Sequence, residues 1–412
     1  MTSLEDYKAQ AKEDMQRGDY GRAIRSLTEA LDIELQNITL YLSRGLAYYM
    51  RHDFDLAIED LTAALALEPQ HLDALITRGN AYLQTGQTHN AIGDYDEYIR
   101  IAPTDPEAPY ARRAAAHASL GQWAEAIEDY GSAIQYSNQD KGKLYFSRAT
   151  LRYNVGDLKG TIDDCTAAVD RKYRAPEVYS ARGSAYANLG LPDEAIADYT
   201  TAIDMDKRDV MAFYNRGAVY YQQGDLEAAI ADFGRAVALS PDDPAPYYAR
   251  SIAYADLGDW HKARQDLSRL LKVQPDNAAA YQKRGTAYAH RGKPDKALKD
   301  FQKAVTLDSK KPAYLTSLGE MLIELEDYAE AITTLKRAVL LQEDATAILS
   351  SRILASLALA CYLSDSIEEA LKYWKLLLER DPRFADPTII ERVFGWREPL
   401  LIALEQMLVA LQ

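Results

Sequence analysis

The stretch YNRGAVYYQQGDLEAAIADF, from Tyr214 to Phe233, combines an Arg-Gly pair, several tyrosines, a Gly-Asp pair and an Ala-Ile-x-Asp segment. Close variants return along the chain, among them LITRGNAYLQTG from Leu75 and YQKRGTAYAHRG from Tyr281. A fixed period of 20 to 50 residues is the signature of a repeat architecture. Here the arginine of the stretch recurs every 34 or 35 residues, at Arg44, Arg78, Arg113, Arg148, Arg182, Arg216, Arg250 and Arg284.

Each repeat reads as two helices joined by a short turn, as residues 210–243 illustrate. Their first half spaces Phe213, Gly217 and the following tyrosines as one face of a helix. Gly224 and Asp225 then interrupt the pattern, because glycine tolerates a left-handed backbone and aspartate caps a new helix. The second half is again helical in its apolar spacing and ends before Pro241. The repeat therefore predicts a pair of antiparallel helices.

Composition and charge exclude several classes of protein. The chain has 412 residues, a net charge of −15 and two cysteines, Cys165 and Cys361. The negative charge argues against a general nucleic-acid binder, which needs clustered Lys and Arg. Two distant cysteines fit a reducing compartment, so we expect a cytoplasmic protein. No apolar run is long enough for a membrane span, and the charged first fifteen residues do not predict a signal peptide.

The unit resembles the tetratricopeptide repeat, a family marked by small residues at three positions, aromatic residues at two, and a proline near its end. In residues 210–243 these are Gly217, Ala229, Ala236, Tyr220, Phe233 and Pro241. The resemblance implies an all-α, right-handed superhelical solenoid of antiparallel helix pairs, with first helices lining a concave groove. Residues 385–412 are expected to form C-terminal capping helices. We expect eleven tandem units, at 4–37, 38–71, 72–105, 107–140, 142–175, 176–209, 210–243, 244–277, 278–311, 312–345 and 351–384.

An aspartate follows each recurring arginine at a distance of sixteen residues, as Asp232 follows Arg216. One interpretation is a ladder of arginines for an anionic ligand. The other, which we favour, is an ion pair inside every unit, because each arginine brings its own carboxylate. Loss of Asp232 alone is then expected to cost more stability than replacing Arg216 by leucine. The first unit and the last two lack the pair and carry Gln10 with Ser26, Leu318 with Thr334 and Leu357 with Tyr373.

Catalytic motifs are absent from the sequence. It contains no phosphate-binding, dinucleotide-binding or metalloprotease motif and no nucleophile elbow. The six histidines show no metal-ligand spacing, and both cysteines occupy core positions of the repeat. We therefore expect no enzyme, no cofactor and no metal.

The resemblance also places positions 2, 5, 9 and 12 of each first helix in the groove. Aromatic anchors supply most of the energy of many protein interfaces, so the apolar lining predicts a site for a protein or peptide segment. The alternative is that these side chains pack along the helices and meet no ligand. The candidate groove residues are Tyr49, Phe146, Tyr153, Tyr214, Tyr221, Tyr248 and Ile252.

Two further features could contact a partner. Lys296, Lys299 and Lys303 share one outer helical face, either as a docking patch for an acidic partner or as an ordinary solvated face. The segment from Pro399 to Leu411 is a strongly apolar helix. We expect it to cap the last repeat; the alternative is a contact with a partner or dimerisation, because a bare apolar face is an association site.

These patterns favour a non-catalytic interaction scaffold, adaptor or assembly factor that holds protein segments in its groove. The alternative function is a stoichiometric structural subunit of a larger complex, a membrane-peripheral one included. Such a subunit would dock through its edges, its lysines or its C-terminal helix rather than insert into a membrane.

Overall fold

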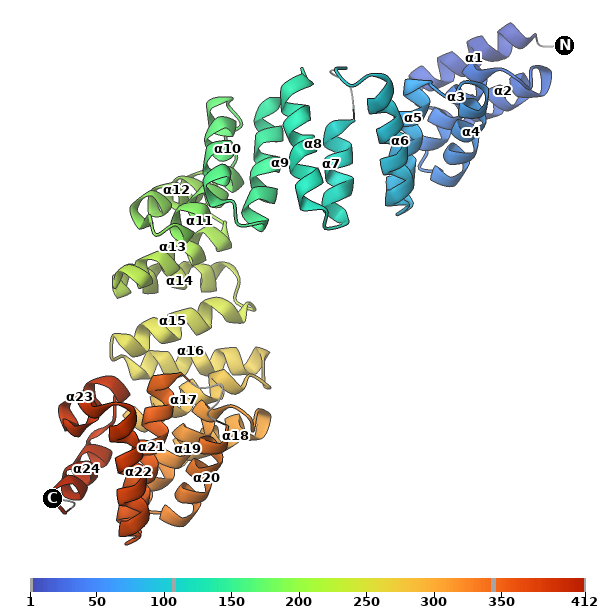
Figure 1. The fold of residues 1–412 in the computed structure, drawn as a ribbon. Coiled ribbons are helices and arrows are strands. Elements are labelled where there is room, and N and C mark those ends of the chain that lie inside the picture. The colour runs from blue at the N-terminus through green and yellow to red at the C-terminus, as the bar shows by residue number, and fades with distance from the viewer. Residues whose placement is uncertain (1–2, 106–108, 139, 342–345, 411–412) are drawn as a thin grey trace. The chain divides into compact units, whose positions relative to one another are not determined.

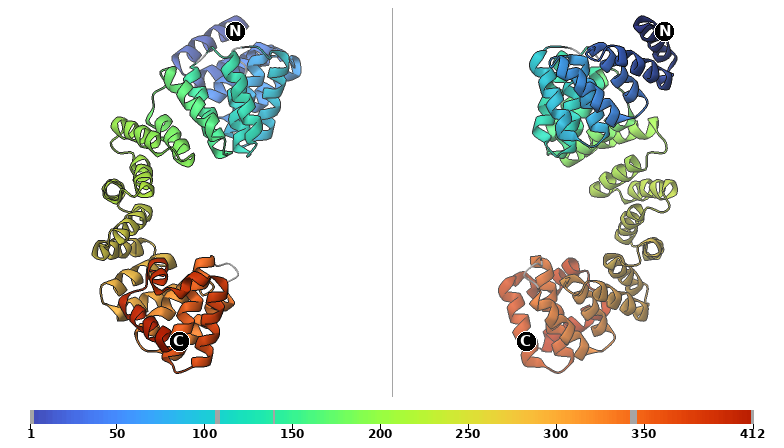
Figure 2. Two further views of the ribbon diagram at one scale, coloured as in Figure 1. Left: turned by 60° about the vertical axis from the view of Figure 1, so that its left-hand side comes forward. Right: turned by 90° about the vertical axis from the view of Figure 1, so that its right-hand side faces the viewer.

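A computed structural model describes residues 3–105, 109–138, 140–341 and 346–410. Within these ranges it contains helices and no strand, and the helices follow one another as antiparallel pairs (Figure 1). The chain divides into two compact units, Met1–Lys207 and Arg208–Gln412. The two further views in Figure 2 show the same pairing of helices inside each unit.

In its described residues the first unit contains six helix pairs. In every pair the odd-numbered helix is the first helix of a repeat and the even-numbered helix is the second. Successive pairs pack on one another through the second helix of one and the first helix of the next. The helices are α1 (Leu4–Arg17), α2 (Tyr20–Ile33), α3 (Ile38–Met50), α4 (Phe54–Leu67), α5 (Leu72–Gln84), α6 (Thr88–Ile101), α7 (Tyr110–Ser119), α8 (Trp123–Tyr136), α9 (Lys141–Asn154), α10 (Leu158–Asp170), α11 (Pro176–Asn188) and α12 (Pro192–Met205).

The part of the second unit that the structure describes contains five pairs and a C-terminal segment, here called the tail, which runs from Pro382 to Ala410. The pairs are α13 (Val210–Gln223), α14 (Leu226–Leu239), α15 (Pro244–Asp256), α16 (Trp260–Val273), α17 (Ala278–His290), α18 (Pro294–Leu307), α19 (Pro312–Glu324), α20 (Tyr328–Leu340), α21 (Ala347–Leu363) and α22 (Ile367–Arg380). The tail comprises the 3-10 helix η2 (Pro382–Ala385), α23 (Pro387–Phe394) and α24 (Glu398–Ala410).

The turn inside a repeat follows from the Gly-Asp pair. Gly224 ends α13 with φ 83°, a left-handed conformation that only glycine adopts at no steric cost. The side chain of Asp225 then accepts a hydrogen bond from the Ala228 amide and caps α14. Close packing of the two helices requires a small residue opposite the second helix. A Cβ atom added to Gly217 would lie 3.0 Å from the ring of Phe233.

Successive first helices also approach one another. Contacts of this kind join α3 to α5, α9 to α11, α13 to α15, α17 to α19 and α19 to α21, and no two successive second helices are as close in the described ranges. First helices therefore form the inner side of each stack, and we call this surface the first-helix face. It is the surface that the family resemblance assigned to the groove.

The fold class predicted from the sequence is confirmed as an all-α solenoid of antiparallel helix pairs. The right-handed superhelical path and the exact division into eleven units stay predictions. Some helices begin earlier than the expected units: α9 begins at Lys141 rather than at residue 142, and α21 begins at Ala347 rather than at residue 351. The expected start of the fourth unit, residue 107, lies outside the described residues. None of the helices in the described ranges combines the length and the apolar character that crossing a bilayer requires.

Candidate functional site: the first-helix face

The recurring arginines are engaged inside their own units. Nε of Arg216 donates to Asp232 Oδ2 at 2.8 Å, and Nη2 donates to Oδ1 at 2.9 Å. Asp232 is only 5% exposed. The internal-pair interpretation is thus confirmed, and an arginine ladder for an anionic ligand is wrong. The same two-point contact forms in Arg44–Asp60, Arg78–Asp94, Arg113–Asp129, Arg148–Asp164, Arg182–Asp198, Arg250–Asp266 and Arg284–Asp300.

Several of these arginines also reach the preceding unit, which sequence reasoning missed. Nη1 of Arg78 donates to Thr62 Oγ1 at 3.1 Å. Sequence could have revealed this contact, because the hydroxyl lies sixteen residues before the arginine just as the carboxylate lies sixteen after it. One guanidinium therefore joins the second helices of two successive repeats. Equivalent contacts join Arg44 to Thr28, Arg182 to Thr166 and Arg113 to Asp96.

The predicted groove residues of the first unit lie on first helices but are engaged with neighbours. The Tyr49 ring meets Phe54 edge-on at 5.5 Å between centroids. Phe146 packs against Tyr173 at 6.0 Å. The Tyr153 hydroxyl accepts a hydrogen bond of 2.9 Å from the Asn188 side chain on the next first helix. All three predicted side chains are partly buried.

In the second unit, α13 and α15 carry the other four predicted groove residues, all partly buried. The Tyr214 ring contacts Phe233 at 5.7 Å. The Tyr221 hydroxyl donates to Asp256 Oδ2 at 2.5 Å, a contact that raises the pKa of Tyr221 to about 12. Burial also raises the pKa of Tyr248. Ile252 lines a cavity of about 130 Å³ between α15, α16 and α17. The first-helix face is therefore aromatic here, and the Tyr221 hydroxyl links α13 to α15.

The three lysines of the predicted docking patch lie on α18. Lys296, Lys299 and Lys303 are exposed, so they form a solvent-facing positive strip on a second helix. The Lys296 ammonium lies 5.7 Å from the centroid of the Tyr288 ring. This strip is separate from the first-helix face, and its use by an acidic partner stays a prediction.

The apolar tail helix α24 packs on the first helices α19 and α21. It therefore contacts the last repeat, and its role as a cap of that repeat stays a prediction. Leu400, Leu404 and Met407 are its buried residues, which lie on one side of the helix at steps of four and three. The tail thus covers the first-helix face of the last two repeats. The contact with α19 was not predicted, because an apolar pattern shows that a helix is buried without showing against what.

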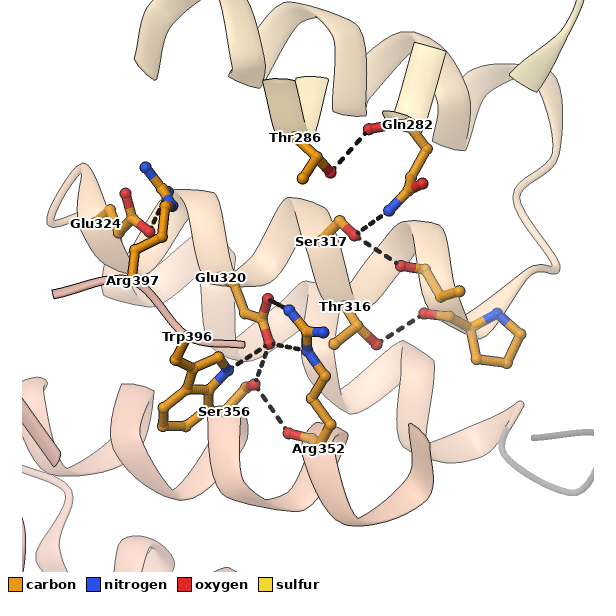
Figure 3. Close-up of polar contacts among 12 residues, drawn as sticks. Gln282, Thr286, Thr316, Ser317, Glu320, Glu324, Arg352, Ser356, Trp396 and Arg397 are labelled. Carbon is orange, nitrogen blue, oxygen red and sulfur yellow. Dashed lines mark hydrogen bonds and ion pairs between the residues drawn. The ribbon is translucent and has the colours of Figure 1, made fainter. Parts of the chain in front are cut away.

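A buried carboxylate organises the contact between tail and repeats (Figure 3). Glu320 on α19 accepts from Arg352 of α21 at 2.7 and 2.6 Å, and from the Ser356 hydroxyl at 2.9 Å. The indole Nε1 of Trp396, in the tail, donates to the same carboxylate at 3.0 Å. The Glu320 side chain is 8% exposed. A buried charge needs such partners, because burial without them is costly.

A second carboxylate holds the neighbouring tail residue. Arg397 pairs with Glu324, and its Nη1 donates to the Ala289 carbonyl of α17 at 2.8 Å. The Glu324 side chain is 7% exposed, and burial raises its pKa. Trp396 and Arg397 therefore attach the tail to α17 and α19 through hydrogen bonds, while α24 adds contact with α19 and α21.

The sequence contained a signal for this site that we did not use. Position 9 of the first helix, one of the expected groove positions, carries a carboxylate in only one of the eleven expected units, and that carboxylate is Glu320. The other ten positions are small, apolar, amide, hydroxyl or lysine side chains. A cavity of about 230 Å³ remains beside this contact, lined by residues that include Gln282, Thr286 and Ser317.

Nothing in the described ranges provides obvious catalytic chemistry. Burial raises the pKa of the Cys165 thiol to about 12 and that of Cys361 to about 11, so neither is an activated nucleophile. No group of three or more His, Cys, Asp or Glu side chains is placed to hold a metal ion in the part of the chain that the structure describes.

Comparisons with known proteins agree with this architecture. Curated protein sequences give no significant match. Among solved structures, the C-terminal part of a TPR repeat-containing protein from Cytophaga hutchinsonii has a TM-score of 0.52 at 19% identity, covering 60% of this chain and 98% of that one. MamA is 27% identical over 41% of this chain and 93% of its own, with a TM-score of 0.39. YrrB, described as a TPR protein with an unusual peptide-binding site, is 19% identical over 45% and 95%, with a TM-score of 0.40.

The sequence profile of the tetratricopeptide repeat matches residues 42–106, 180–244, 248–312 and 291–348, together more than half of the chain. The matched segments fall on helix pairs of both units. The helix pairing, the small residues between paired helices and this profile lead to one conclusion: the chain belongs to the tetratricopeptide repeat family.

Proposed function

We propose that the protein is a non-catalytic scaffold that binds helical or extended segments of other proteins on its first-helix face. The observation that carries the proposal lies within the chain itself, where the same face of α19 and α21 already holds the apolar helix α24. Tetratricopeptide repeats are protein-interaction modules in general. The finer roles of adaptor or assembly factor belong to the proposal, as does a cytoplasmic location, which the two unpaired thiols support.

The proposed partner site is the part of the face on α13 and α15. Tyr214, Tyr221, Tyr248 and Ile252 are partly exposed there, next to a cavity that an apolar side chain can enter. Aromatic rings offer apolar area together with a hydroxyl that orients a partner. Because these rings also pack against the helices, their removal will affect folding as well as binding. A second variant is therefore needed that blocks the face without removing a ring.

The test is capture of partners from the cells in which the chain is naturally expressed, quantified by mass spectrometry. Tyr248→Ala is expected to weaken capture about thirtyfold, the effect of losing about 2 kcal/mol at a central anchor. Ala255→Glu, which blocks the cavity on this face without removing an aromatic ring, should do the same while leaving the melting temperature close to that of the native chain. Undiminished capture by both variants would exclude this site.

The matched control is the triple variant in which Lys296, Lys299 and Lys303 are all alanine. It leaves the first-helix face intact and should not reduce capture. If it does reduce capture and the two variants of the face do not, the alternative of docking through the outer lysine strip gains support. One stoichiometric partner in place of varied ones would favour a fixed subunit of a complex.

A further inference from the structure

We infer that the outer surface of the second helices α14, α16, α18 and α20 binds an acidic, extended segment of another protein. One cation from each helix forms this surface, which we call the cationic column. Its members stand at one position of the repeat, 34 residues apart, and are Arg235, Arg269, Lys303 and Arg337. All four side chains are exposed. Because the column lies on second helices, this site is additional to the first-helix face of the proposed function.

The column belongs to the second unit alone. In the first unit no cation stands at the same position of the repeat. The residues there are Glu29, Ala63, Glu97, Ser132, Ala167 and Thr201. Whole helices show the same contrast: the six second helices of the first unit carry four Lys or Arg against eighteen Asp or Glu, whereas α14, α16, α18 and α20 carry ten against six. Four successive repeats therefore reverse the charge of this surface within an acidic chain.

Ion pairs within the chain do not account for the column. The buried aspartates of α14, α16 and α18 pair with arginines of the first helices. The remaining ion pairs of these four second helices, in the described ranges, are Lys262–Asp259 and Lys336–Glu369. No member of the column is paired with a carboxylate there. The charge of the column is thus available to carboxylates of a partner, with which guanidinium and ammonium groups form charge-assisted hydrogen bonds.

The helix macrodipole does not account for the column either. Cations are stabilised in the last turn of a helix, yet of the four only Arg337 lies in the last turn. The exposed acids of these helices are Glu227, Asp295 and Glu330, seven or eight residues before the column. That separation is about 11 Å along a helix axis, which exceeds the Debye length of about 8 Å at physiological salt. These acids therefore do not cancel the charge of the column on their own helices.

The pattern of the column fits an extended acidic chain better than a membrane surface. Axes of packed helices lie about 10 Å apart, and an extended chain advances about 3.3 Å per residue. A carboxylate at about every third or fourth residue would therefore meet successive second helices. A membrane surface would need apolar side chains that insert between the cations. Among the described residues of these helices, the exposed large apolar side chains are Val273 and Leu340, both at the end of a helix.

The test measures the fluorescence anisotropy of a labelled peptide in which glutamate recurs at every third residue among serines. The native full chain should bind this peptide in low-salt buffer, and added salt should weaken the binding. The column variant combines Arg235→Gln, Arg269→Gln, Lys303→Gln and Arg337→Gln. It should bind about tenfold more weakly, because exposed ion pairs are individually weak and several must be lost together.

A matched control variant removes the same number of exposed cations outside the column. It combines Arg291→Gln, Lys293→Gln, Lys310→Gln and Lys311→Gln. This variant should keep most of the peptide binding, because the column remains. Equal weakening in the two variants would overturn the inference, and so would a native chain that does not bind the peptide.

Two further probes of the native chain separate the possible occupants. A peptide of the same composition with its glutamates in one block should bind more weakly than the spaced peptide. Equal binding of the two peptides would show a general attraction of polyanions and would overturn the column as a site. Vesicles that contain phosphatidylserine should not retain the chain in co-sedimentation. Retention by vesicles without binding of the spaced peptide would replace the acidic segment by a membrane surface.

The outcome is independent of the proposed function. All substituted cations are exposed, so both variants should keep the native helicity and melting temperature, measured by circular dichroism. Partner capture that depends on Tyr248 should be unchanged in the column variant. If the spaced peptide fails to bind while Tyr248→Ala still weakens capture, only this inference falls.

Discussion

The two ends of the second unit differ in where their buried charged side chains lie. In the repeats that end with α18, the buried charges are an Arg–Asp pair closed within one unit, as in Arg250–Asp266. In the last two repeats that pair is replaced by Leu318 with Thr334 and Leu357 with Tyr373. The buried charges there are Glu320 and Glu324, which lie on the first helix α19 under the tail and pair with Arg352 and Arg397.

The difference shows how placement of a charge decides what a repeat can do. An ion pair between the two helices of a unit is satisfied before any partner arrives, so the first-helix face remains free. A buried carboxylate on the first-helix face needs a covering segment that supplies hydrogen-bond donors. In this chain the tail is that segment. In the second unit, a buried carboxylate on the first-helix face therefore occurs where the internal pair has been lost.

The largest loss of stability is expected when Glu320, the carboxylate that binds the tail, is removed. Glu320→Ala removes the acceptor of Arg352, Ser356 and Trp396 at once, and strands a partly buried guanidinium. We expect the second unit to lose about 3 to 5 kcal/mol of unfolding free energy, measured by urea denaturation with tryptophan fluorescence. Glu405→Ala, on the exposed side of α24, is the control and should be nearly neutral. A loss no greater than that of the control would mean that the cluster does not stabilise the unit.

Breaking one Arg–Asp pair inside a repeat should cost less unfolding free energy than Glu320→Ala. The side-chain exposures favour the opposite order to the one expected from the sequence, since the Asp232 side chain is 8% exposed and that of Arg216 is 16% exposed. Arg216→Leu strands the less accessible carboxylate and should cost about 3 kcal/mol, whereas after Asp232→Ala the long arginine can turn toward water. Thermal unfolding of both variants checks this order. A greater loss in Asp232→Ala would restore the first expectation.

The smallest effect concerns the link between successive units. Thr62→Val removes the hydroxyl that accepts from Arg78 while keeping the shape of the side chain. A single hydrogen bond of this kind contributes about 1 kcal/mol, so the first unit should unfold at slightly lower urea concentration. Thr306→Val, at an exposed threonine that bonds only its own helix, provides the comparison. Equal midpoint shifts in the two variants would show that the link adds no stability between repeats.

Much of this protein could be read from its sequence, because the repeat is a local and periodic code. Gly217 and Phe233 predict the close helix pair, Gly224 and Asp225 predict the turn, and the sixteen-residue offset predicts the ion pair. Each of these contacts joins residues of one unit, so spacing along the chain is enough to place them. Recurrence in eight units made the ion-pair prediction secure.

The surface against which the tail packs could be determined only from the tertiary structure. Trp396 and Glu320 are 76 residues apart, and the Arg397 contact to Ala289 spans 108. No periodic pattern connects such distant positions, and an apolar helix carries no information about which surface it will bury. The sequence by itself determined the helices, their pairing and the internal ion pairs; the fold alone decided that the tail turns back onto first helices, because that choice depends on surfaces that exist only once the repeats have stacked.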